Sequence, residues 1–144
     1  MYRVSAKELL SWSQNIINDS CDEDSFYLLM DLVGGISRSE FTKLRINPQN
    51  KDSIFLNESL PNLFSKWKDH ILNKKPIQYI AGFTYWRDLK LKVSSDVLIP
   101  RVETEQIVDI VKDIFSNNEH QILFTDLGTG SGALAVSISK SYPS

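Results

Sequence analysis

The sequence is poor in the residues that build disulfide or metal frameworks. Cys21 is the single cysteine among 144 residues, so no disulfide can form within the chain. The two histidines, His70 and His120, lie far apart and have no metal-ligand spacing. Because no histidine lies near Cys21 in the sequence, we expect a half-buried thiol near a helix start and not a nucleophile. These absences predict neither a metal site nor a cysteine-based catalytic site.

A long hydrophobic run and a large net charge are also missing. No apolar stretch approaches the roughly 20 residues of a membrane span, and the first residues do not resemble a signal peptide. Lys and Arg number 16 against 18 Asp and Glu, for a net charge of −2 and a pI near 5.7. Lysine runs such as Lys74-Lys75 fit a solvated helix face better than an RNA contact. We therefore expect a cytoplasmic protein with no direct nucleic-acid partner and no membrane partner.

Residues 1–75 have helical periodicity. Sequences of the form S-x-x-E, which can form capping boxes, open three predicted helices: Ser5-Ala6-Lys7-Glu8, Ser20-Cys21-Asp22-Glu23 and Ser37-Arg38-Ser39-Glu40. The first helix is predicted to end near Asn18, and Gly34-Gly35 closes the second. A fourth spans Leu60 to Asn73. This pattern predicts a small helical bundle.

The periodicity changes after Lys74-Lys75-Pro76, because proline disfavours the helical conformation of the residue before it. We place a domain boundary here. From Ile77 the period becomes two: Phe83 and Tyr85, then Leu89, Leu91 and Val93, alternate with polar residues around a turn near Arg87-Asp88. The pattern predicts a β-hairpin within residues 76–100. An amphipathic helix is predicted over residues 103–115.

The last part of the chain has the pattern strand, glycine-rich turn, helix. The apolar residues 121–126 lead into Gly128-Thr129-Gly130-Ser131-Gly132, and a helix is predicted from Ala133. This order opens a parallel α/β sheet. Glycines at alternate positions let the backbone turn tightly and approach a ligand, and the following helix directs its amides at that ligand. The loop therefore predicts a site for a nucleotide-like cofactor.

Two cofactors are compatible with this loop. Gly128, Gly130 and Ala133 fit the loose pattern G-x-G-x-x-G/A of dinucleotide sites. Two details favour S-adenosylmethionine over a nicotinamide cofactor. Asp126 precedes the first glycine by two positions, where a carboxylate suits the ammonium group, and the third glycine, Gly132, is at the fifth position of the loop.

A second segment of interest is L-I-P-R-V-E-T-E, residues 98–105. Arg101 is a cation just before the predicted helix, and Thr104 or Glu103 can cap that helix and add negative charge to its first turn. Taken alone, this pattern is typical of helix capping with a surface ion pair.

Together these segments resemble the HemK/PrmC family of peptide chain release factor glutamine N-methyltransferases. The resemblance is carried, in order, by the helical region, P-I-Q-Y-I-A-G at residues 76–82, the hairpin, residues 97–105 and the loop at 126–132. It implies an α/β, multidomain fold with a Rossmann-like S-adenosylmethionine-dependent methyltransferase domain. Residues 1–75 would dock the release factor, 76–100 would form the hairpin linker, and 101–144 would begin the methyltransferase domain.

The resemblance also implies roles for single residues. Cofactor-binding residues would be Asp126, Gly128, Thr129, Gly130, Ser131 and Gly132, with Arg101, Glu103 and Thr104 at the border of the pocket. Val102 stands where the family usually has proline. The family's Asn-Pro-Pro-Tyr segment, which holds the substrate glutamine, and the acidic residue that binds the cofactor ribose do not occur in this sequence. No catalytic residue can therefore be assigned.

The function expected from the resemblance is S-adenosylmethionine-dependent methylation of a glutamine side-chain amide in a release factor. We expect this chain to be a partial sequence that ends after the first strand, loop and helix of its catalytic domain, and to be inactive alone. One alternative is a catalytically inactive module that docks a protein partner. The other is a nicotinamide-dependent oxidoreductase, which the loose glycine pattern alone supports.

Overall fold

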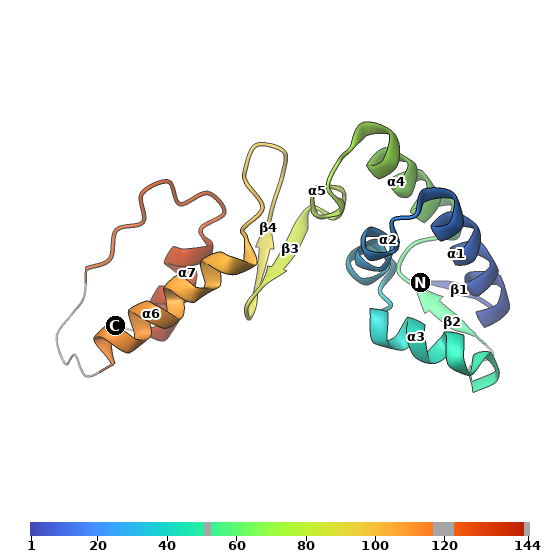
Figure 1. The fold of residues 1–144 in the computed structure, drawn as a ribbon, viewed down its shortest axis with the longest axis horizontal. Helices are drawn as coiled ribbons and strands as arrows, with labels where there is room; N and C mark the ends of the chain where they lie inside the picture. Colours follow the sequence, from blue (N-terminus) through green and yellow to red (C-terminus); the bar gives the residue numbers. More distant parts are fainter. Residues whose placement is uncertain (51–52, 117–122, 143–144) are drawn as a thin grey trace. The chain divides into compact units, whose positions relative to one another are not determined.

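The computed structural model describes residues 1–50, 53–116 and 123–142, which combine helices with two small antiparallel sheets (Figure 1). The chain divides into two compact units, Met1–Ala81 and Gly82–Ser144. The elements of the first unit are β1 (Tyr2–Val4), α1 (Ala6–Ser20), α2 (Glu23–Leu29), η1 (Met30–Gly34), α3 (Arg38–Ile46), η2 (Pro48–Asn50), β2 (Ile54–Leu56), α4 (Leu60–Asn73) and α5 (Ile77–Ala81). Those of the second are β3 (Phe83–Trp86), β4 (Leu89–Lys92), η3 (Val102–Thr104), α6 (Glu105–Phe115) and α7 (Ala133–Ser141).

Helix α1 begins where the sequence predicts and ends slightly later. The Ser5 hydroxyl accepts a hydrogen bond from the Glu8 amide at 3.1 Å, which stabilises the first turn. The predicted capping box at Ser20 is wrong, since Ser20 is the last residue of α1 and its hydroxyl donates to the Ile16 carbonyl. The cap of α2 is instead Asp22, whose carboxylate accepts from the amide of Ser25 at 3.1 Å.

Cys21 lies between α1 and α2 in the left-handed conformation, with φ of 55°. Its amide donates to the carbonyl of Ile17 and so closes α1. The side chain is exposed, so the expectation of a half-buried thiol is wrong. The reason is the sharp turn between the two helices, which directs this residue away from the core.

The predicted second helix changes its hydrogen bonding part of the way along. After α2, residues Met30 to Gly34 form the π-helical turn η1. Gly35 closes it with φ of 76°, and its amide donates to the carbonyl of Met30. The positive φ favours glycine here, and a Cβ on Gly35 would also lie 2.4 Å from Nδ2 of Asn57, so that this side chain would have to move. The predicted closure of the helix by this pair of glycines is confirmed.

The capping box predicted at the start of α3 is present in full. Ser37 accepts from the amide of Glu40, and the Glu40 carboxylate accepts from the amide of Ser37. Helix α4 has the predicted bounds and is capped by Ser59. The short helix α5 corrects the predicted change of period at Ile77, because the alternating pattern begins only with β3.

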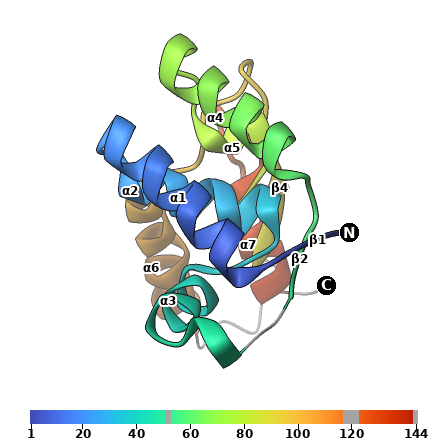
Figure 2. The same cartoon turned by 90° about the vertical axis from the view of Figure 1, so that its right-hand side faces the viewer.

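The pairing of β1 with β2 was not predicted from the sequence. Arg3 lies opposite Phe55 in this antiparallel ribbon, and Val4 lies opposite Ile54. The inward-facing residues Val4, Ile54 and Leu56 are buried against the helices. The ribbon therefore closes one side of the helical unit, as Figure 2 shows.

The core of the first unit is built around Phe26, which has no exposed surface. Its ring contacts four other aromatic rings, with centroid distances of 5.8 Å to each of Trp12, Tyr27 and Phe41 and 6.0 Å to Trp67. These rings come from α1, α2, α3 and α4, so one side chain joins all four helices. Tilted and edge-to-face arrangements of this kind stabilise beyond simple burial.

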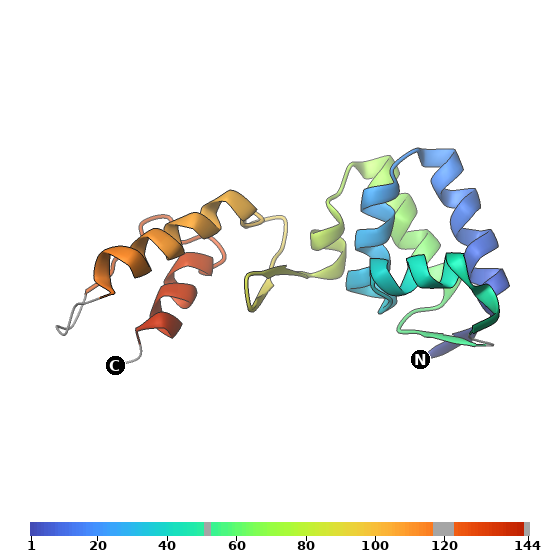
Figure 3. The ribbon, with the colours of Figure 1, turned by 60° about the horizontal axis from the view of Figure 1, so that its bottom comes forward.

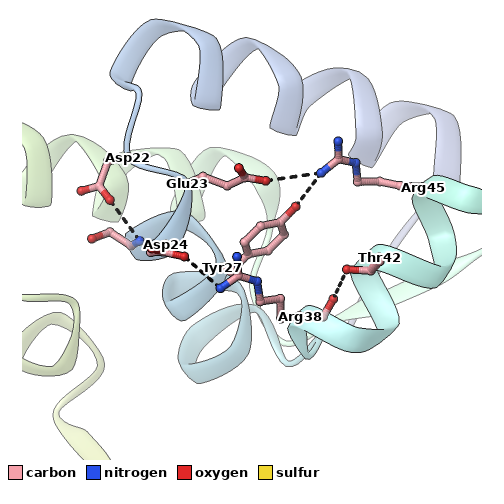
Figure 4. Close-up of polar contacts among 8 residues, drawn as sticks. Asp22, Glu23, Asp24, Tyr27, Arg38, Thr42 and Arg45 are labelled. Carbon is pink, nitrogen blue, oxygen red and sulfur yellow. Dashed lines mark hydrogen bonds and ion pairs between the residues drawn. The ribbon is translucent and has the colours of Figure 1, made fainter.

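A polar network at the surface joins α2 to α3 (Figure 4). The Arg45 guanidinium donates to the Tyr27 hydroxyl at 2.9 Å and pairs with Glu23 at 3.4 Å. Arg38 lies over the Tyr27 ring, 4.8 Å from its centroid, and pairs with Asp24 at 2.8 Å. The hydrogen bond to the Tyr27 hydroxyl is the main cause of the raised pKa of Arg45. Exposed ion pairs individually add little to the free energy of unfolding. We therefore infer that the main role of this network is to orient α3 against α2.

In the second unit the hairpin β3–β4 packs against α6 and α7, which lie side by side (Figure 3). Its turn is at Arg87-Asp88, as predicted, and Trp86 pairs with Leu89. On β3 the buried residues are Thr84 and Trp86, while Tyr85 is 59% exposed, so the predicted inner face of that strand is wrong. Paired residues share a face, and Trp86 therefore lies on the same side as Leu89 and Leu91.

The predicted strand at residues 121–126 falls partly outside the described residues. Its described part, residues 123–126, is neither helix nor strand and pairs with no other strand in the part of the chain that the structure describes. Helix α7 begins at Ala133, as predicted from the sequence. Within the described ranges, no helix has the length and apolar character needed to cross a membrane.

Candidate functional site

The glycine loop lies immediately before α7. Its three glycines, Gly128, Gly130 and Gly132, have φ values of 77°, 56° and 78°, all in the left-handed region. A Cβ on Gly128 would meet no atom within 4 Å, and one on Gly130 or Gly132 would meet its nearest neighbour only at 3.9 Å. The glycines are therefore required by backbone conformation and not by packing within the chain. The space beside the loop is open to a ligand.

The carboxylate of Asp126 faces back toward the loop. Its Oδ2 accepts a hydrogen bond from the Thr129 hydroxyl at 3.0 Å. The amide of Gly132 donates to the Thr129 carbonyl at 2.9 Å. Thr129 therefore binds Asp126 at the start of the loop through its hydroxyl and Gly132 at the end through its carbonyl. Asp126 is half-buried, whereas the loop up to Gly130 is exposed. This arrangement fixes a carboxylate beside an open, glycine-rich backbone.

No side chain of the N-cap residue caps the first-turn amides of α7. Gly132 occupies that position and has no side chain to accept from the first-turn amides. These amides carry the positive end of the helix dipole. A carboxylate or nucleotide group suits such a helix end, so the loop fits the cofactor type expected from the sequence.

The second candidate segment lines a different hollow. Arg101, Glu103 and Thr104 line an open cavity of about 900 Å³, with Ile99, Pro100, Val102 and Ile107. Arg101 and Glu103 are exposed, and Thr104 is half-buried. The structure therefore brings these three predicted residues together. The lining of this hollow does not include the glycine loop.

The capping predicted for this segment is wrong. Neither Arg101 before η3 nor Thr104 before α6 forms a side-chain cap. Thr104 has helical backbone angles, because η3 runs directly into α6 and leaves no extended residue from which a side chain could reach the amides. Within the described residues, Arg101 also forms no ion pair, so the guanidinium is available for another partner.

A hydrogen bond and a close approach relate the candidate segments to the rest of the second unit. Nε1 of Trp86 donates to the carbonyl of Arg101 at 2.9 Å. The position of a Cβ on Gly130 would lie 4.0 Å from Cγ2 of Val97, so the loop before Pro100 approaches the glycine loop. Neither Trp86 nor Val97 was predicted from the sequence as a site residue. The two-residue turn at Arg87-Asp88 could have revealed Trp86, because it places that residue opposite Leu89 on the inner face.

A charged cluster fixes the hairpin turn on α6. Arg87, with φ of 53°, binds Asp109 through two hydrogen bonds of 2.8 and 3.1 Å. Its amide also donates to the carboxylate of Glu105. The hydrogen bonds between Arg87 and Asp109 raise the pKa of the arginine and lower that of the aspartate. Beside them the hydrogen bond from Lys140 lowers the pKa of Asp88. The turn is thus held to both helices.

No group of three or more His, Cys, Asp or Glu side chains that could hold a metal ion occurs among residues 1–50, 53–116 and 123–142. The described part of the second unit thus offers a glycine loop, one fixed carboxylate and one unpaired arginine. This donor set is suited to an organic ligand with cationic and anionic groups.

Comparison with known proteins identifies relatives along nearly the whole chain. A release factor glutamine methyltransferase of Prochlorococcus marinus is 36% identical over 140 residues, which are 96% of this chain and 47% of the relative. One of Synechocystis is 41% identical over 120 residues, 78% of this chain and 38% of the relative. One of Thermosynechococcus vestitus is 35% identical over 135 residues, 92% of this chain and 45% of the relative. No protein-family model matches the chain.

These relatives are all methyltransferases by name, which gives the class of protein to which the chain is related. More narrowly, each of them is named a release factor glutamine methyltransferase, and the predicted resemblance of the chain to this family is confirmed. It spans less than half the length of each of the three relatives described above.

Proposed function

We propose that this chain is part of an S-adenosylmethionine-dependent methyltransferase that modifies the side-chain amide of a glutamine in a peptide chain release factor. The observation that carries the proposal is the match to release factor glutamine methyltransferases over 96% of the chain. The open glycine loop beside a fixed carboxylate supports it. Such an enzyme would act in the cytoplasm, where its substrate terminates translation.

The proposed division of labour follows the order of the chain. Residues 1–75 dock the protein substrate, 76–100 form the linking hairpin, and 101–144 begin a Rossmann-like catalytic domain. The compact core around Phe26 supports a docking role, because a unit with its own core can present a rigid surface. The Asn-Pro-Pro-Tyr segment that would hold the glutamine does not occur in these 144 residues, so we expect this chain to be inactive alone.

The glycine loop is the proposed cofactor site. Asp126 would hold the ammonium group, the backbone from Gly128 through Thr129, Gly130 and Ser131 to Gly132 would follow the cofactor, and Arg101, Glu103 and Thr104 would border its pocket. S-adenosylmethionine supplies a methyl group on a sulfonium centre. The contribution of this chain is to hold and orient, and correct positioning accounts for most of the acceleration in a displacement of this kind.

Methyl transfer by the polypeptide of the complete reading frame tests the proposal. With labelled S-adenosylmethionine and a release factor, we expect label in a glutamine of the factor. No incorporation with a folded enzyme and factor would refute the proposed activity. If NADH instead competes with S-adenosylmethionine for binding to the complete protein, the result would support the oxidoreductase alternative.

Two matched glycine variants test the cofactor site itself. Gly128→Ala and Gly82→Ala replace glycines with φ of 77° and 78°, and neither new Cβ would meet an atom within 4 Å. Both impose the same backbone strain, of about 1–2 kcal/mol. We expect only Gly128→Ala to weaken cofactor binding, by about tenfold or more, because its Cβ enters the ligand space. Equal effects of the two variants would show that the loop is only structural.

A second candidate function is a docking module without catalysis. The independent core of the first unit favours it. In that case residues 1–81 would retain a release factor in a pull-down. The polypeptide of the complete reading frame would transfer no methyl group to it.

A further inference from the structure

The indole of Trp86 connects the core of the second unit to the backbone of a candidate site segment. Its side chain is 2% exposed and belongs to a buried cluster with Leu91 and Val108. The ring has one polar atom, Nε1, which donates to the carbonyl of Arg101 at 2.9 Å. A buried donor that loses its partner is left desolvated and unpaired, so the ring strongly favours a carbonyl at this place.

The carbonyl of Arg101 accepts a second hydrogen bond. The amide of Thr104 donates to it at 3.2 Å and forms the turn η3. One oxygen therefore joins the core to the turn that carries Arg101, Glu103 and Thr104. The exposed side chains of this turn are held through their backbone, because within the described residues the turn has no side-chain cap.

The same buried cluster reaches the glycine loop. Ala133, the first residue of α7, is 5% exposed and belongs to the cluster of Trp86. It directly follows Gly132, the last glycine of the loop. The cluster thus contacts residues 101–104 through the hydrogen bond from Trp86, and it contacts the glycine loop through the packing of Ala133. Side chains in such close-packed interiors do not shift independently.

We propose that Trp86 is a positioning residue that holds residues 101–104 and the glycine loop in one fixed arrangement for a shared ligand. The identity of that ligand, S-adenosylmethionine, rests on the proposed function. The arrangement itself does not. Trp86 touches no reacting atom in this proposal, and it acts through the backbone of Arg101.

The test removes the N–H group and keeps the shape of the ring. Benzothienylalanine at position 86 replaces the donor by sulfur in a bicycle of nearly the same size, and Trp86→Phe serves as a second variant. Leu91→Val, in the same cluster, is the control that loosens packing and leaves the hydrogen bond intact. Amide hydrogen exchange of Thr104 and Gly132 is measured in the polypeptide of the complete reading frame, together with its affinity for S-adenosylhomocysteine.

We expect the benzothienyl variant to accelerate exchange at Thr104 by about fivefold, the factor for one ordinary hydrogen bond, and to weaken ligand binding by a similar factor. The Leu91→Val control should lower thermal stability and leave the exchange at Thr104 unchanged, because it keeps the hydrogen bond from Trp86 to the Arg101 carbonyl. Unchanged exchange at Thr104 would overturn the inference, and so would faster exchange with unchanged affinity. If the unaltered protein binds no S-adenosylhomocysteine, the proposed function fails, and exchange alone then decides whether Trp86 fixes the segment.

Discussion

Replacement of Phe26 by alanine tests whether the first unit depends on one aromatic centre. The ring is fully buried and contacts four aromatic partners at 5.8–6.0 Å. Loss of a buried phenylalanine costs about 3–5 kcal/mol, and each aromatic pair adds about 0.5–1.5 kcal/mol beyond burial. We expect a loss in the upper part of the first range, close to 5 kcal/mol. Because whole domains are stable by only about 5–15 kcal/mol, the variant should leave this unit barely folded.

Urea unfolding of the complete 144-residue chain measures this effect. Trp12 and Trp67 lie beside Phe26, so their fluorescence reports on the first unit. Phe55→Ala is the matched control, because that ring is 58% exposed and its loss should change stability by less than about 0.5 kcal/mol. A loss below about 1.5 kcal/mol for Phe26→Ala would refute the idea that its ring joins the four helices.

Three further predictions concern conformation and charge. Gly35→Ala should destabilise the first unit by at least about 1 kcal/mol in urea unfolding, because φ is 76° and the new Cβ would lie 2.4 Å from a neighbouring side chain. Burial favours a raised pKa for Asp22, but hydrogen bonds from His70 and a backbone amide outweigh it and lower the pKa. The stabilisation is therefore present above the usual aspartate pKa and is lost as the pH falls, so the decline in unfolding temperature between about pH 5 and pH 3 should be smaller in Asp22→Asn. Arg87→Lys should lower the unfolding temperature of the second unit, because lysine cannot form the paired hydrogen bonds to Asp109, and Asp109→Asn should add little in the double variant.

The features that sequence analysis predicted well depend on contacts between near neighbours. The Ser37 capping box, the closure at Gly35 and the turn at Arg87-Asp88 each need only a few adjacent residues. The left-handed glycines before α7 follow the same rule, since glycine adopts a positive φ without the steric cost that other residues have.

The features that were missed depend on distant parts of the chain. Strand β1 has three residues, too few for a recognisable pattern, and it exists because β2 lies beside it. Trp86 gained its importance from a carbonyl 15 residues away. The capping expected from Thr104 failed because a 3₁₀ turn runs straight into α6, a detail of backbone geometry that residue type does not determine. Propensity describes a residue, whereas these contacts are set by tertiary packing.

The ribbon of β1 and β2 has a consequence for how the first unit is made. In the sequence, α1, α2 and α3 come between its two strands. Arg3 and Val4 can therefore pair with β2 only after Ile54 and Phe55 have been synthesised. Such long-range closure is slow compared with helix formation. During synthesis the first helices can form while Val4 still lacks its partner strand. A bulky amino-terminal fusion tag would lie next to this late-forming strand, whereas a carboxy-terminal tag would leave it unobstructed.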